Sequence, residues 1–230
     1  MKQLLTLLDD LLAPRGVKCL CCDARSEGDM LCQDCRTALY AMRLDPEEGS
    51  RGNIHCAYRY DGVAKQLVVS LKDQCVSDAA LVLAEGMLDI VRRMQLPPET
   101  ILTWVTMPLR RRKRRAIDHG YELCKAMGDL CGLPVKQLLY RKGSPHTQRG
   151  LSRERRLRNL EGTFLCNERL TGPVLLVDDV MTTGSTVAVC MEALMMAGAS
   201  QVYVITATKA NLADMRFDLR KVDVNGLYAP

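Results

Sequence analysis

Aromatic residues are scarce in this 230-residue chain, since two phenylalanines, one tryptophan and seven tyrosines make up only 4% of it. Apolar residues nevertheless reach 47%, so a full core is possible, but aliphatic side chains and the 12 methionines must fill it. No apolar run approaches the roughly 18 residues that a membrane-spanning helix needs, and Asp9 and Asp10 interrupt the leucine-rich start. We therefore expect neither a membrane span nor a secretion signal.

Two common phosphate-binding motifs are also missing. The chain contains no Gly-Lys pair, which excludes the P-loop, and it has no G-x-G-x-x-G fingerprint of dinucleotide-binding folds. Any site for a phosphorylated ligand must therefore be built in another way.

Cysteine, by contrast, is abundant, with 11 residues in the chain. Scattered cysteines without a secretion signal favour a reducing compartment, so we expect a cytoplasmic protein. Cys19-x-x-Cys22 and Cys32-x-x-Cys35 form two pairs separated by nine residues, and four thiolates in this pattern predict a closed tetrahedral zinc site. Cys21 is left over as a non-ligand. A disulfide pair or a redox-active C-x-x-C remains the alternative, although neither suits two pairs in a reducing compartment.

Positive charge is concentrated in one part of the chain. Residues 105–160 hold 15 lysines and arginines against 4 acidic residues, a net charge of +11, whereas the rest holds 17 against 23, a net charge of −6. This polarity predicts a positive face and an anionic partner, either a phosphate ligand or a nucleic acid. Because Tyr121 and Tyr140 are the only aromatic residues nearby, contact with a nucleic-acid backbone is favoured over reading of bases.

Strand and helix patterns alternate along most of the chain and predict an α/β fold with a parallel sheet. We expect an N-terminal helix and cysteine module over residues 1–45 and an α/β domain over 54–210, joined by a polar connector at 43–53. The predicted strands are 54–60, 101–107, 135–140, 174–178 and 201–208, and the predicted helices are 61–73, 77–94, 116–132, 152–160 and 185–198.

The stretch VLLVDDVMTTGST, residues 174–186, carries the strongest chemical signal. Asp178 and Asp179 follow a buried strand, and a hydroxyl-rich turn then opens a helix, which is where ligands of parallel sheets collect. The carboxylates suit ribose hydroxyls or a water-bridged Mg²⁺, and the helix start suits a phosphate, so a 5-phosphorylated ribose fits both. The phosphate-binding candidates are Thr182, Thr183, Gly184, Ser185 and Thr186. An ordinary strand–turn–helix with a polar tip would explain one acid and one cap residue, but not two acids and four hydroxyls.

This stretch resembles the phosphoribosyl diphosphate (PRPP) binding motif of type I phosphoribosyltransferases. Together with YRYDGVAKQLVVSLKDQ and RKGSPHTQRGLSRERRLRNLEGTF, it resembles the ComF family over residues 19–208. That family joins a cysteine module to a phosphoribosyltransferase-like domain. The resemblance implies that Asp178 and Asp179 contact the ribose hydroxyls and that residues 182–186 hold the 5-phosphate. Basic residues near the same end of the sheet would contact pyrophosphate or nucleic acid, namely Arg110, Arg111, Arg115, Arg141 and Lys142.

One block departs from the family pattern, because Thr106 replaces a proline, Ala116 a glycine and Ile117 an aromatic residue. The resemblance implies a protein that binds PRPP or a related ligand and handles single-stranded DNA during natural competence, with competence proteins as partners. The alternative is an active phosphoribosyltransferase that moves ribosyl 5-phosphate from Mg-PRPP to a nucleobase or amine and releases pyrophosphate. A scaffold that keeps the pocket without using it is a third interpretation, which the altered block keeps open.

Overall fold

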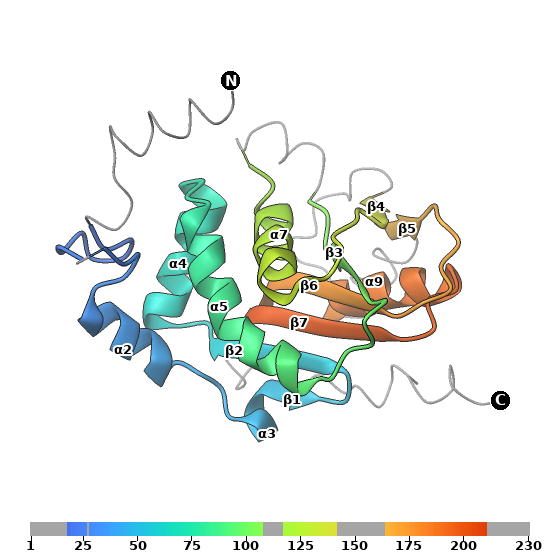
Figure 1. Cartoon of the computed structure of the whole chain (residues 1–230), viewed down its shortest axis with the longest axis horizontal. Coiled ribbons are helices and arrows are strands. Elements are labelled where there is room, and N and C mark those ends of the chain that lie inside the picture. The colour runs from blue at the N-terminus through green and yellow to red at the C-terminus, as the bar shows by residue number, and fades with distance from the viewer. Residues whose placement is uncertain (1–17, 27, 108–116, 142–163, 211–230) are drawn as a thin grey trace, which may run out of the picture.

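The computed structural model describes residues 18–26, 28–107, 117–141 and 164–210 of the chain. Its larger sheet has the strand order β1-β2-β7-β6-β3 (Figure 1). Four of these strands run parallel, and β1 adds an antiparallel edge. The strands are β1 (Ser50–Arg51), β2 (Ile54–Arg59), β3 (Ile101–Trp104), β6 (Val174–Met181) and β7 (Val202–Lys209). The predicted α/β fold with a parallel sheet is therefore confirmed.

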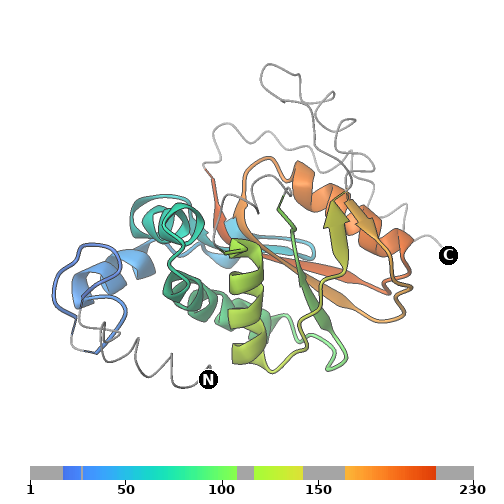
Figure 2. The same ribbon diagram turned by 90° about the horizontal axis from the view of Figure 1, so that it is seen from above.

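Helices cover both faces of this sheet (Figures 1 and 2). One face carries α4 (Gly62–Asp73), α5 (Asp78–Arg93) and α7 (His119–Cys131), and the other carries α9 (Ser185–Met196) with the hairpin β4 (Leu139–Arg141) and β5 (Phe164–Cys166). Because side chains alternate along a strand, Leu175 and Val177 of β6 join the first cluster, whereas Val174 and Leu176 join the second.

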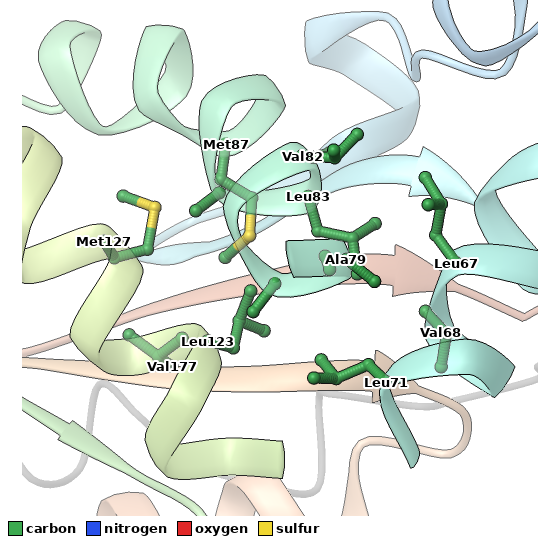
Figure 3. Packing of buried hydrophobic residues seen from close by; sticks show 14 of the residues in the cluster. Leu67, Val68, Leu71, Ala79, Val82, Leu83, Met87, Leu123, Met127 and Val177 are labelled. Carbon is green, nitrogen blue, oxygen red and sulfur yellow. The ribbon is translucent and has the colours of Figure 1, made fainter. Parts of the chain in front are cut away.

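Aliphatic side chains and methionine fill the core, as the composition predicts. Figure 3 shows Met87 of α5 and Met127 of α7 beside Leu123 and Val177, and both methionine side chains are fully buried. Flexible thioethers fill irregular gaps that aromatic rings would fill in other proteins.

Most helix ends follow signals that can be read in the sequence. The carboxylate of Asp61 accepts a hydrogen bond from the Gly62 N–H at 2.8 Å, at the start of α4. Gly132 ends α7 in the left-handed conformation, with a φ of 71°. The strand predicted over residues 101–107 ends sooner, at Trp104. The strand predicted over 135–140 is reduced to a single bridge from Val135 to Leu102, followed by β4.

The connector at 43–53 differs from the predicted linker, because it forms the short helix α3 (Pro46–Gly49) and strand β1. The Leu44 N–H donates to the Ala57 carbonyl at 3.0 Å, which ties this segment to β2. A side chain at Gly49 would begin 2.8 Å from the Cys56 carbonyl oxygen, so glycine is required for this close approach. The connector is thus part of the sheet edge.

The cysteine module packs against the same core as the sheet. It includes α2 (Gln33–Ala41), and its buried residues Cys19, Leu31 and Leu39 lie in one hydrophobic cluster with α4 and α5. The predicted N-terminal helix lies outside the described residues, and the domain limits 1–45 and 54–210 stay predictions. Among the helices that the structure describes, none is long and apolar enough to cross a membrane.

Candidate functional site

The two acids lie inside β6 rather than after its end. Pairing of β6 with β7 continues past them, with Asp178 opposite Thr206 and Met181 opposite Lys209. The predicted strand ends too early because its apolar run stops at Val177, although the backbone ladder goes on. Neighbouring residues of a strand point to opposite faces, so Asp179 faces α4 and α7 and Asp178 faces α9.

Asp179 is 4% exposed and lies between two basic side chains. The Lys72 Nζ lies 2.6 Å from its Oδ1, and the His119 Nε2 lies 3.1 Å from its Oδ2. Burial would raise the pKa of Asp179, but the contacts with His119 and Lys72 outweigh burial and lower it. Asp179 is therefore ionised at neutral pH and compensated by charge from within the protein. Its main-chain carbonyl also accepts a hydrogen bond from Thr208 Oγ1 at 2.8 Å.

Asp178 differs from Asp179, because its pKa is raised rather than lowered. Burial and the neighbouring Asp179 carboxylate raise the pKa of Asp178 to about 8, although its side chain keeps some contact with solvent. At neutral pH this carboxyl group is therefore mostly protonated and can donate a hydrogen bond as well as accept one. Of the two adjacent acids, Asp178 is therefore the one that favours its protonated form.

The predicted phosphate loop lies between the end of β6 and the start of α9. Gly184 is the N-cap of α9 in the left-handed conformation, with a φ of 72°. Thr183 Oγ1 lies 2.9 Å from Ser185 Oγ, and the Ser185 N–H donates to Thr183 Oγ1 at 3.5 Å. Thr182 and Thr183 are exposed. The loop therefore offers hydroxyls to solvent beside the N–H groups of a helix start, which suits an oxyanion.

The end of β3 adds two donors next to the same edge of the sheet. Within the described residues, Trp104 Nε1 and Thr106 Oγ1 are buried without a hydrogen-bond partner. The Trp104 ring packs 5.2 Å from that of Tyr121, and a side chain at Gly120 would begin 3.0 Å from Trp104 Cδ1. These contacts hold the first turn of α7, and with it His119, against β3.

Of the basic residues predicted to contact pyrophosphate or nucleic acid, the structure describes Arg141. Its guanidinium lies 5.1 Å from the centre of the Phe164 ring, on the hairpin beside α9. Burial raises the pKa of Cys190 in α9, the charge of Asp178 adds to this rise, and the charge of Arg141 opposes it. Asp178 and Arg141 are therefore both near Cys190, on the α9 side of the sheet. The other four lie outside the described residues: Arg110, Arg111, Arg115 and Lys142.

Lys72 and His119 lie at the site, but the sequence motifs do not predict that either residue contacts Asp179. His119 stands out in the sequence only as a possible phosphate contact, and the role of Lys72 does not follow from its motif. The available signal is helical spacing, since Lys72 lies four residues after buried Val68 and therefore beside the core-facing stripe of α4. A lysine in that position reaches toward the carboxyl ends of the strands.

The four predicted zinc ligands come together. The sulfur atoms of Cys19, Cys22, Cys32 and Cys35 all lie within 4.8 Å of one another, and Cys21 is not part of the group. All 11 cysteines are free, and the 3.6 Å between the sulfurs of Cys22 and Cys32 excludes a disulfide between them. The group could therefore hold a metal such as zinc.

The electrostatics of the four thiols fit a metal. Burial would raise the pKa of Cys19, but backbone N–H groups of Cys32, Cys22 and Cys21 around its sulfur lower the pKa to about 6. One of these is the Cys21 N–H, 3.5 Å from the Cys19 sulfur. Burial and the neighbouring sulfurs raise the pKa of Cys35, so four thiolates this close together need a cation.

Part of this sequence is similar to curated proteins. The protein named DNA utilization protein YhgH from Salmonella typhi is 33% identical over 144 residues, which cover 60% of this chain and 62% of that protein. Its namesake from Salmonella typhimurium strain LT2 is 36% identical over 148 residues, covering 60% and 63%. This chain is similar to YhgH. It spans less than two thirds of the length of these curated relatives, and no family model matches it.

Among solved structures, the similarity is weaker. Glutamine PRPP amidotransferase from B. subtilis has a TM-score of 0.40 at 18% identity, covering 57% of this chain and 26% of that one. UMP synthase of Leishmania donovani has a TM-score of 0.40 at 14% identity, covering 71% and 30%. Scores below 0.5 leave the function of this chain to be argued from its own residues.

Proposed function

We propose that the corner between β6 and α9 binds a 5-phosphorylated ribose, as PRPP or a related sugar phosphate. The observation that supports this proposal is the juxtaposition of Asp178 with the loop at residues 182–186. A phosphate at the loop would meet helix N–H groups and the exposed hydroxyls of Thr182 and Thr183. The ribose hydroxyls would then meet the carboxyl group of Asp178, which can both donate and accept. We also propose that the chain is a ComF-like protein with a phosphoribosyltransferase-like domain.

Calorimetric titration with Mg-PRPP tests this function. We expect binding by the full chain and a Kd at least about tenfold weaker for the double variant Asp178→Asn, Asp179→Asn, which corresponds to about 1.4 kcal/mol. Thr183→Val leaves the acids in place and removes a hydroxyl of the loop, so it is expected to weaken binding as well.

Asp129→Asn, on the exposed side of α7, is the matched control and is expected to bind as the wild type does. Circular dichroism of each variant separates lost binding from lost folding. The absence of any heat with the wild-type chain would overturn the proposed function.

Mg²⁺ enters this proposal as part of the Mg-PRPP ligand, where phosphate oxygens hold it. Asp179 does not suit direct coordination, because its Oδ1 contacts Lys72 and its Oδ2 lies next to His119. Asp178 is mostly protonated at neutral pH, since burial and Asp179 raise its pKa to about 8, and a protonated carboxyl group is a poor ligand for a hard cation. The two acids therefore do not suit a directly bound Mg²⁺.

We further propose that the chain handles single-stranded DNA, with competence proteins as its partners and the cytoplasm as its compartment. The relatives are named DNA utilization proteins, and residues 105–160 carry a net charge of +11. The free thiols at all 11 cysteines agree with a reducing compartment. Arg141, on the hairpin at the same side of the sheet as Asp178, is the basic contact residue that the structure describes.

An electrophoretic shift assay tests DNA binding. We expect unrelated single-stranded oligonucleotides to bind at about 50 mM salt, and binding to fall by at least about tenfold at about 200 mM, because counterion release dominates contact with a phosphate backbone. Affinity that differs strongly between the oligonucleotides would contradict backbone binding, and the absence of a shift at low salt would overturn the DNA proposal.

A second candidate function is phosphoribosyl transfer, which the same pairing of Asp178 with the hydroxyl loop at residues 182–186 would serve. In the transfer, the bond from C1 of the ribose to pyrophosphate breaks, a bond from C1 to the acceptor nitrogen forms, and the acceptor loses a proton. Release of pyrophosphate with a panel of nucleobases and amines supports this candidate, and its absence leaves binding alone.

A further inference from the structure

The acidic pair carries its own counter-ion. Lys72 reaches Asp179 from the last turn of α4, with its Nζ 2.6 Å from Oδ1. Asp179 is 4% exposed, so water screens this contact poorly, and the side chain of Lys72 is only 24% exposed. Such an ion pair persists at ordinary ionic strength.

The position of Lys72 conflicts with a metal ion on the same carboxylate. Mg²⁺ binds carboxylate oxygens at about 2.0–2.1 Å and demands near-octahedral geometry. An ion on Oδ1 would lie next to the Lys72 ammonium, and an ion on Oδ2 would meet the His119 ring, whose Nε2 is 3.1 Å away. Either position brings a divalent cation against a basic side chain within a buried site.

We infer that Lys72 takes the place of a divalent cation at the acidic pair, so that the ribose 5-phosphate part of a ligand binds without Mg²⁺. Lys72 is then a positioning residue, since it holds the carboxylate of Asp179 next to Asp178, which meets the ribose, and does not itself touch the ligand. This inference rests on the proposed function and deepens it, because it extends the ligand class to phosphoribosyl compounds without a pyrophosphate. Such compounds lack the pyrophosphate that carries Mg²⁺ in Mg-PRPP.

Calorimetry with ribose 5-phosphate tests the inference, using the full chain in buffer freed of divalent cations and in the same buffer with excess Mg²⁺. Removing the cations from the buffer before adding protein leaves a metal in the cysteine group undisturbed. We expect the two Kd values of the wild type to agree within about twofold. Lys72→Met is expected to bind at least about tenfold more weakly without Mg²⁺ and to regain affinity when Mg²⁺ is added. Lys72→Arg keeps the charge and is expected to stay independent of Mg²⁺.

Lys65→Met is the matched control, because Lys65 is exposed on the same helix and its ammonium lies over the ring of Tyr60. It is expected to match the wild type in both buffers. A simple packing role for Lys72 would not create a dependence on Mg²⁺, so this readout separates positioning from stability.

Three results would overturn the inference while the proposed function stands: wild-type binding of ribose 5-phosphate that requires Mg²⁺, no binding of ribose 5-phosphate in either buffer although Mg-PRPP binds, or Lys72→Met binding as tightly as the wild type without Mg²⁺. The first comparison needs no variant, so the inference stays falsifiable even where Lys72→Met does not fold. The absence of Mg-PRPP binding by the wild type would overturn the proposed function, and the inference with it.

Discussion

Cys22→Ser is expected to remove the metal from the cysteine group and to lower the midpoint of thermal unfolding by about 10 °C. In a chain of this size, about 1 kcal/mol corresponds to roughly 2–4 °C, and a structural metal contributes several kcal/mol. The effect reaches the whole chain because Cys19, Leu31 and Leu39 pack in the same hydrophobic cluster as α4 and α5. Loosening the module therefore also exposes part of the main core.

The neighbouring cysteine supplies the control. Cys21 is half-buried and lies outside the metal-binding group, and burial together with the surrounding thiols raises its pKa to about 12, so it stays a neutral thiol. We expect Cys21→Ser to keep the zinc content and unfolding midpoint of the wild type. Zinc per chain by mass spectrometry and the midpoint by scanning calorimetry decide the case. Loss of zinc in Cys21→Ser, or its retention in Cys22→Ser, would contradict the assignment of the ligands.

The two adjacent acids are expected to affect stability in opposite directions. Asp179→Ala should lower the free energy of unfolding by about 3 kcal/mol at pH 7, because it leaves Lys72 and His119 without their buried partner. We take the lower end of the usual range because Lys72, at 24% exposure, can turn toward water. Asp178→Asn should instead give a higher free energy of unfolding than the wild type, by a margin that grows as the pH rises.

The sign for Asp178 follows from its raised pKa of about 8. The folded chain keeps a proton that the unfolded chain has already lost, so stability from this group is full below about pH 4 and disappears as the pH rises through about 8. Asparagine mimics the protonated acid at every pH. We therefore expect Asp178→Asn to equal the wild type near pH 4 and to exceed it increasingly as the pH rises, by about 1 kcal/mol at pH 8 after discounting for partial exposure.

Urea unfolding at pH 5, 7 and 8 measures both effects. Asp129→Ala, an exposed acid on α7, is expected to change stability by less than about 0.5 kcal/mol. Burial opposes the lowering of the Asp179 pKa, but His119 and Lys72 outweigh it, so this group shows the reverse pH trend. The stability that Asp179 contributes is present above its ordinary pKa and is lost in acid. Equal responses of Asp178→Asn and Asp179→Ala would contradict the unequal roles of the two acids.

Local patterns predicted much of this fold. Asp61 and Gly132 marked helix ends, and the apolar stripes of α4 and α5 were regular enough to place these two helices, whereas α9 is apolar nearly all round. The failures occurred where pairing rather than periodicity sets the structure. The connector carries turn-type residues, yet β2 offers it an edge to pair with, and β6 continues past Val177 because β7 pairs with it as far as Lys209.

The order of residues was enough to locate the acids, the hydroxyl loop and the four cysteines that cluster, because each of these groups is contiguous or regularly spaced. The partners of Asp179 lie far from it in the sequence, since Lys72 precedes it by 107 positions and His119 by 60. No spacing rule joins them. Only packing of α4 and α7 on one face of the sheet brings a lysine and a histidine to the same carboxylate, and that packing makes two neighbouring aspartates different in charge.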